Sequence, residues 1–149
     1  MTARSAPRRS SRDDRGQIYL WAMLLSLLLF GLAGLSVDLW RAISAWRSFA
    51  ATADAAAAAG ASGIDEAVFR TSGGATVQLD PASAEALAYQ NLAAQTDDSE
   101  ITGYTASATT EQITVVVNGQ IDFALLGILT STDSLSLSAT ATADPRPSG

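Results

Sequence analysis

The side chains on which most enzyme chemistry depends are missing from this chain. It contains no Cys and no His, which excludes disulfide bonds, Cys/His zinc sites and nucleophiles activated by an imidazole. Carboxylates remain, and they can act alone as acid and base in glycoside hydrolysis. Those that cluster lie in predicted loops, where acids are usually only solvated: Asp65, Glu66, Asp97, Asp98 and Glu100. We therefore expect no catalytic, cofactor or metal site and no enzyme.

Phosphate-bearing partners are also disfavoured. The Gly73-Gly74 pair lacks the Lys-Ser/Thr that follows the glycines of a phosphate-binding loop. Five Arg and two acids precede Gln17, whereas four Arg and thirteen acids lie from Asp38 onward, so this later part has a net charge of -9. Such a surface repels polyanions. We expect no nucleic-acid partner.

The clearest structural signal is a membrane span. No charged residue occurs between Gly16 and Val37, and a helix needs about 20 apolar residues to cross the hydrocarbon core. A helix from Tyr19 to Trp40 would cover roughly 31 Å, which matches the separation of the two interfacial belts where Tyr and Trp are enriched. We predict a transmembrane helix over 17–37 in contact with the lipid bilayer. Burial in a soluble core is the alternative.

The basic residues define the direction of the span. Five of them precede it: Arg4, Arg8, Arg9, Arg12 and Arg15. By the positive-inside rule, 1–16 is a cytoplasmic segment and 38–143 is an extracytoplasmic domain, in a single-pass protein of the plasma (inner) membrane. A cleaved secretory signal has the same basic-then-apolar order, and Ala42-Ile43-Ser44 would be a weak cleavage site. Its apolar region is normally shorter, and Trp40 and Arg41 stand where small residues are expected.

The helix is expected to continue outside the membrane. Residues 38–60 contain strong helix formers and no Pro, and Gly60 and Gly63 can end the helix because Gly tolerates the left-handed conformation. The Ala-rich stretch 50–61 is either low in complexity or a surface on which a sheet or a second helix packs closely. Within it, Asp54 is expected to be a solvated charge.

The rest of the domain is predicted to be α+β. Residues 61–79 are expected to form a loop, and a second helix over 80–96 starts with Asp80 as N-cap and Pro81 at the first helical position. Its apolar stripe comprises Ala84, Leu87, Ala88 and Leu92. Alternating apolar and polar residues over 100–143 predict three antiparallel strands, with the insertion FALLGIL before the last. The tail 144–149 is expected to be disordered.

Small and polar residues on the first helix are the candidate packing points. Inside lipid, helices associate through such residues because there is no hydrophobic driving force. The candidates are Ala22, Ser26, Gly31, Ala33, Gly34 and Asp38. Ala22, Ser26 and Ala33 share one face, which predicts an oligomer through the transmembrane helix. Asp38 pairs either with Arg41 one turn later or with a basic group of a neighbouring subunit.

Several segments together resemble the TadE/TadG-like proteins of bacterial Flp (Tad) pilus assembly. They are DRGQ before the span, GLAGLSVD at its outer end, ADAAAAAGA at 53–61, and VVVNGQIDFALLGIL followed by SLSLSATATA near the end. The resemblance implies a pilin-like fold and a membrane-anchored, non-enzymatic component of a pilus assembly or secretion machine. Its expected partners are other pilin-like or Tad-system membrane proteins.

The chain departs from this family at two points. Members cut by prepilin peptidase are cleaved after a Gly and carry Glu five residues later; here Gly16 and Gln17 form the candidate peptidase site, but the fifth following residue is Trp21. We therefore expect the N-terminus to be retained. Longer members carry a metal-binding Asp-x-Ser-x-Ser motif, and the segment beginning at Asp133 does not match it.

Two functions of different kinds follow. The first is a pseudopilin-like or minor-pilin-like subunit of the Tad/Flp machine. The alternative is a stand-alone, membrane-anchored envelope module whose acidic domain binds a cationic or wall-associated partner. A neighbouring gene for a secretion ATPase or a small Flp pilin would favour the first.

Overall fold

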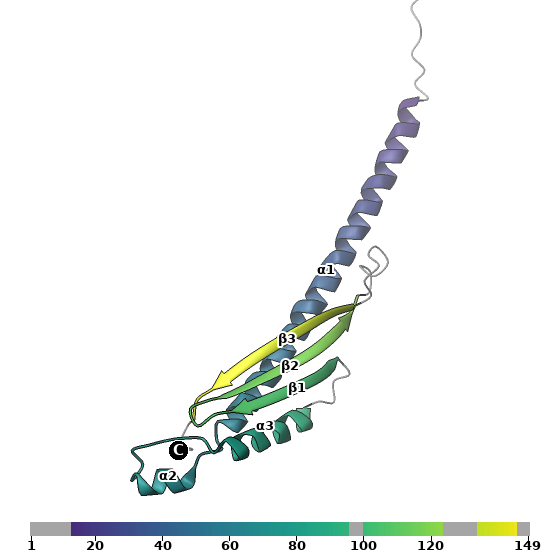
Figure 1. Cartoon of the computed structure of the whole chain (residues 1–149). Coiled ribbons are helices and arrows are strands. Elements are labelled where there is room, and N and C mark those ends of the chain that lie inside the picture. The colour runs from purple at the N-terminus through teal and green to yellow at the C-terminus, as the bar shows by residue number, and fades with distance from the viewer. Residues whose placement is uncertain (1–12, 96–99, 124–133, 146–149) are drawn as a thin grey trace, which may run out of the picture.

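The computed structural model describes residues 13–95, 100–123 and 134–145. The elements follow the order α1 (Asp13–Gly60), α2 (Glu66–Thr71), α3 (Pro81–Gln95), β1 (Ile101–Ala108), β2 (Ile113–Asp122) and β3 (Ser134–Ala143). The strands form one antiparallel sheet in the order β1-β2-β3 (Figure 1). The predicted α+β class, with a long helix, a short second helix and three antiparallel strands, is confirmed. Predictions for 1–12, most of FALLGIL and 146–149 lie outside the described residues.

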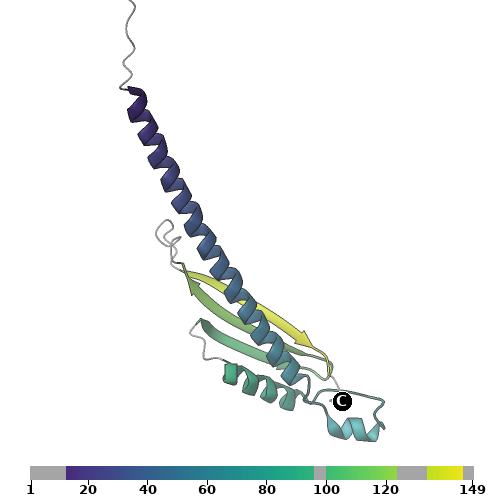
Figure 2. The same ribbon diagram turned by 180° about the vertical axis from the view of Figure 1, so that it is seen from behind.

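Helix α1 is one continuous rod of 48 residues, about 72 Å long at 1.5 Å per residue. It begins at Asp13, a turn before the expected start near Gln17, because the uncharged run delimits the membrane segment and a helical backbone can extend past it. Figures 1 and 2 show its C-terminal half lying along the sheet, while its N-terminal half extends away from the domain. The two halves therefore have different surroundings.

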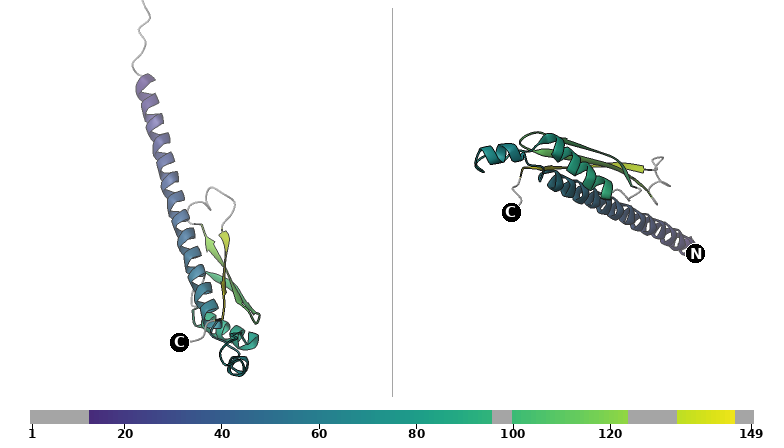
Figure 3. Two further views of the ribbon diagram at one scale, coloured as in Figure 1. Left: turned by 90° about the vertical axis from the view of Figure 1, so that its left-hand side faces the viewer. Right: turned by 90° about the horizontal axis from the view of Figure 1, so that it is seen from below.

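The C-terminal half of α1 packs through alanine. Ala53, Ala56 and Ala57 are buried. They are covered by the sheet and α3, which both pack on the same side of α1 (Figure 3). Of the two interpretations of the Ala-rich stretch, close packing is therefore the one that the structure supports. Asp54 is exposed, as expected of a solvated charge.

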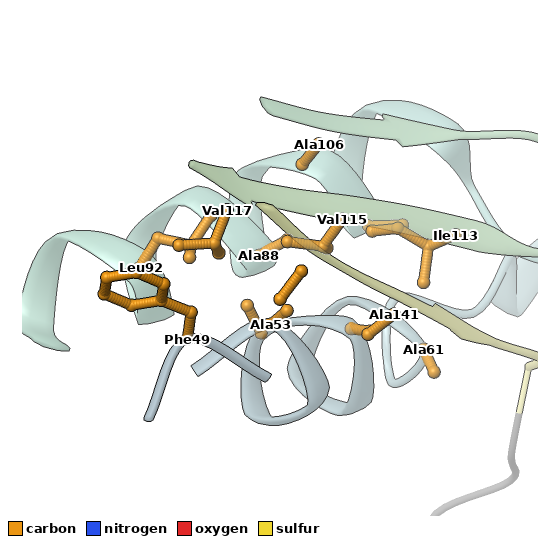
Figure 4. Close-up of a cluster of buried hydrophobic side chains, with 14 of the residues drawn as sticks. Phe49, Ala53, Ala61, Ala88, Leu92, Ala106, Ile113, Val115, Val117 and Ala141 are labelled. Carbon is orange, nitrogen blue, oxygen red and sulfur yellow. The ribbon is translucent and has the colours of Figure 1, made fainter. Parts of the chain in front are cut away.

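Among the described residues, Phe49 is the only aromatic residue that is fully buried, and it fills a space left by a glycine. Phe49 of α1 is 1% exposed and lies near Leu92 and Val117 (Figure 4). A Cβ atom at Gly119 of β2 would come within 2.2 Å of the Phe49 Cζ atom. Glycine at this position therefore lets the aromatic ring lie directly against the β2 backbone.

The glycines at the end of α1 have a different role from the one predicted. The helix does end at Gly60, but among the described residues only Gly73 and Gly74 have positive φ. A Cβ atom at Gly60 would lie 2.3 Å from the Ile113 Cδ1 atom, and one at Gly63 would lie 2.7 Å from the backbone nitrogen of Ala84. The left-handed explanation is wrong: glycine is needed because α3 and β2 pack too closely for a side chain.

The prediction of a plain loop over 61–79 is also wrong in part. The segment contains α2, whose N-cap Asp65 accepts hydrogen bonds from the backbone N–H groups of Ala67 and Val68, and a β-bridge joins Ile64 to Leu79. Helix α2 buries none of its residues, so it has no apolar periodicity by which it could have been recognised. Its local cap is the signal that was missed.

The second helix and the strands follow their predicted patterns. Asp80 accepts hydrogen bonds from Ala82 N–H and the Ser83 hydroxyl, and Ala84, Ala88 and Leu92 are buried while Leu87 is half-buried. Alternate residues of β2 are buried. In β3, Ala139 and Ala141 are buried but Leu135 is exposed, although it pairs with the buried Ile121 of β2, because β3 is an edge strand.

Candidate functional site

The N-terminal half of α1 is a large exposed apolar surface. The helix is long and apolar enough to cross a membrane, and the side chains of its apolar segment are almost all exposed. Apart from Gly34 and Asp38, the buried residues of α1 lie between Ala45 and Gly60. Since apolar side chains in this number are not left in water, a bilayer or other helices must cover them.

The predicted packing face is accessible on this surface. Ala22, Ser26 and Ala33 are all exposed. The Ser26 hydroxyl donates a hydrogen bond to the Ala22 carbonyl oxygen at 2.8 Å, and the Ser36 hydroxyl bonds in the same way to Leu32. Because these donors are satisfied within the helix, Ser26 offers a neighbouring helix a small surface for close approach and an acceptor oxygen.

The other predicted packing residues divide into two groups. Gly31 is exposed, and nothing lies within 4 Å of the position of its missing Cβ atom. Gly34 and Asp38 are buried within the chain, with Asp38 only 2% exposed. They lie one turn apart and in line with Ala45 and Thr52, which are also buried. This seven-residue spacing was a signal in the sequence that Asp38 belongs to the domain-facing side of α1.

The candidate peptidase site lies inside the helix. Gly16 and Gln17 are exposed and helical, and α1 begins three residues before Gly16. A peptidase that binds an extended backbone would have to unwind this first turn. Retention of the N-terminus, which is expected from Trp21, stays a prediction.

A shallow polar hollow of about 260 Å³ lies beside α1 where the domain begins. It is lined by Trp40, Arg41, Ser44, Ala45, Ser48 and Glu100. Trp40 is expected at the outer membrane interface, so the hollow would lie just outside the bilayer. The hollow is open, and Arg41 and Glu100 give it one basic and one acidic side chain.

The described residues contain no group of three or more acidic side chains that could hold a metal ion. No family model, no curated protein and no solved structure matches this chain. The function must therefore be argued from the geometry of α1 and its domain.

Proposed function

We propose that this chain is a non-enzymatic, membrane-anchored component of a Tad/Flp-type pilus assembly or secretion machine, with the role of a pseudopilin-like or minor-pilin-like subunit. The observation that carries the proposal is the division of α1. Its N-terminal half is apolar and exposed, and its C-terminal half is buried by a small antiparallel sheet. A pilin-like subunit needs both parts, an anchor that can pack with other helices and a domain held rigidly at its end.

The resemblance of the sequence to TadE/TadG-like proteins supports the same role. The most specific part of the resemblance, 38–61, includes the part of α1 on which the domain packs. In this proposal the N-terminus is cytoplasmic, the domain is extracytoplasmic and the exposed face of Ala22, Ser26 and Ala33 meets other pilin-like helices. The acidic domain contacts components of the machine outside the membrane.

Deletion and complementation in the native bacterium test the proposal. Loss of the gene is expected to abolish or strongly reduce surface pili, counted by electron microscopy, and the intact gene is expected to restore them. The Ser26→Leu variant is expected to restore fewer pili at normal membrane levels, because a larger side chain holds neighbouring helices apart. Met23→Leu, which nearly conserves side-chain volume in the same exposed segment, is the control and should restore pili fully.

Normal pili in the deletion strain would disprove the proposal. The alternative, an envelope module that binds a cationic or wall-associated partner through its acidic domain, would then account for the anchored domain. Mass spectrometry of the protein from membranes adds an independent result. A retained N-terminus is expected, and a chain that begins at Gln17 would instead indicate a processed filament subunit.

A further inference from the structure

One side of α1 carries an unbroken heptad repeat. Counting alternately three and four residues from Ile18 reaches an apolar residue every time as far as Trp46: Ile18, Trp21, Leu25, Leu28, Leu32, Leu35, Leu39, Ala42 and Trp46. In each of the other six registers over this stretch, at least one position is a Gly, polar or charged residue. We call these nine residues the α1 seam. A strict repeat of this kind is the pattern of helices that supercoil around one another.

The α1 seam is exposed except at Ala42, which packs against the edge of the domain core. Ala42 is half-buried, and the larger side chains of the seam retain between 45% and 65% of their exposed area. The last three residues, Leu39, Ala42 and Trp46, lie at or beyond the interfacial Trp40, so the hydrocarbon core does not cover all of the seam. An apolar surface that continues out of the bilayer requires a partner other than lipid tails.

The continuation of the same register already has a partner in this chain. The next positions are Phe49, Ala53 and Ala56, which are 1%, 0% and 0% exposed beneath the sheet and α3. In the C-terminal part of α1, the repeat is therefore a surface that packs against the sheet and α3. This continuity indicates that the exposed part is also built to pack.

The near absence of charged residues beside the seam is compatible with a second copy of the chain as that partner. The positions that flank the seam from Gln17 to Ala50 carry no charged residue except Asp38, which is buried. Arg41, Arg47 and Asp54 lie on other sides of the helix. Two copies anchored in one membrane have parallel α1 helices, and a repeat of identical a and d residues is complementary to itself in that orientation.

We propose that α1 forms a parallel coiled coil with the α1 of a second copy through the seam, from within the bilayer to Trp46. The packing is by knobs into holes, with Leu at most central positions. The domains lie on opposite sides of the pair, because each domain covers the flank of its own helix that carries Gly34, Asp38 and Ala45. The small face of Ala22, Ser26 and Ala33 stays free for other membrane helices.

The absence of Cys in this chain makes disulfide scanning a direct test. Single substitutions in the full chain, expressed in its native membrane, would place a thiol on the seam (Leu39→Cys, Ala42→Cys, Trp46→Cys) or off it (Trp40→Cys, Ser44→Cys, Arg47→Cys). After mild oxidation of membrane vesicles, the seam variants are expected to give several-fold more disulfide-linked dimer than the off-seam variants. The alternation along the helix is the signature, since random collisions would crosslink all exposed positions alike.

Three crosslinking patterns would overturn the inference: no dimer at any seam position, equal dimer on and off the seam, or dimer only at Ala22→Cys, Ser26→Cys and Ala33→Cys. A crosslinked species whose mass is not twice that of the chain would also overturn it, since the partner would be another protein. Each variant must reach the membrane at normal levels, which immunoblotting checks. The test does not depend on pili. If the seam variants form dimers in a bacterium in which deletion of the gene leaves pili normal, the seam inference stands and the proposed function is rejected.

Discussion

At the scale of single residues, the core depends on glycines that make room for other side chains. Gly60 and Gly63 allow α3 to approach α1, and Gly119 accommodates the ring of Phe49. The space at each position is filled by a residue distant in the sequence. An added methyl group is therefore expected to be destabilising at these positions, although nothing in their backbone conformation requires glycine.

Gly119→Ala is expected to lower the free energy of unfolding of the domain by about 1–3 kcal/mol, the usual cost of overpacking a core. The reason is the 2.2 Å approach between the new Cβ atom and Phe49. Thermal unfolding in detergent, followed by circular dichroism, measures the change. Gly103→Ala is the matched control in the same sheet, because nothing lies within 4 Å of that position, and it should not lower stability. Equal melting temperatures for Gly119→Ala and the wild type would contradict this account.

At the scale of elements, α3 supports the sheet and also closes one of its edges. The Tyr89 hydroxyl accepts a hydrogen bond from Ala106 N–H at 3.2 Å and donates one to Ala106 C=O at 3.4 Å. One turn earlier on α3, Glu85 accepts a hydrogen bond from Ala108 N–H at 3.0 Å. These N–H and C=O groups of β1 point away from β2, toward the open edge of the sheet. Another strand could pair with them at that edge. Side chains of α3 occupy them instead, which protects this edge.

Tyr89→Phe is expected to cost roughly 1 kcal/mol, the net value of hydrogen bonds whose backbone partners can be resolvated. The ring contact with Tyr104, at 6.1 Å between centroids, would remain. Amide hydrogen exchange should accelerate at Ala106 and stay unchanged at Ala108, whose acceptor is Glu85. Glu85→Gln keeps an acceptor oxygen and serves as the control. Faster exchange at both amides would mean that α3 had detached, and the edge-capping account would fail.

At the scale of the whole molecule, one helix joins two environments. The first half of α1 is exposed and apolar, and its second half packs against the sheet and α3 to form one side of the core. Since no flexible linker interrupts α1, the orientation of the membrane segment is transmitted directly to the domain. Pairing of two helices through the seam would therefore also orient the two domains.

The direction of insertion is expected to depend on the Arg residues before the span. Replacing Arg4, Arg8, Arg9, Arg12 and Arg15 by Glu removes the basic bias from which a cytoplasmic N-terminus is predicted. Protease treatment of spheroplasts should digest the domain of the wild-type protein but spare a fraction of the domain in the substituted protein. Replacing Arg41 and Arg47 instead is the control and should leave the domain fully accessible. Complete digestion in both cases would show that charge does not determine the direction.

The sequence by itself determined the types and order of the main elements. The uncharged run, the Asp80-Pro81 helix start and the two-residue alternation of β2 and β3 are local patterns, in which neighbouring residues carry the whole signal. The predictions from them agree with the structure to within a few residues. Helix α2 was missed because it buries nothing, so its only signal was the capping carboxylate of Asp65.

Only the tertiary structure decided which positions are buried against distant residues. Asp38 and Gly34 were candidates for contact with other subunits, but folding buries them within the chain. The roles of Gly60, Gly63 and Gly119 and the capping of Ala106 by Tyr89 depend on pairs separated by 17 or more residues. Such contacts follow from how α1, α3 and the sheet pack together, and no local pattern of residues specifies them.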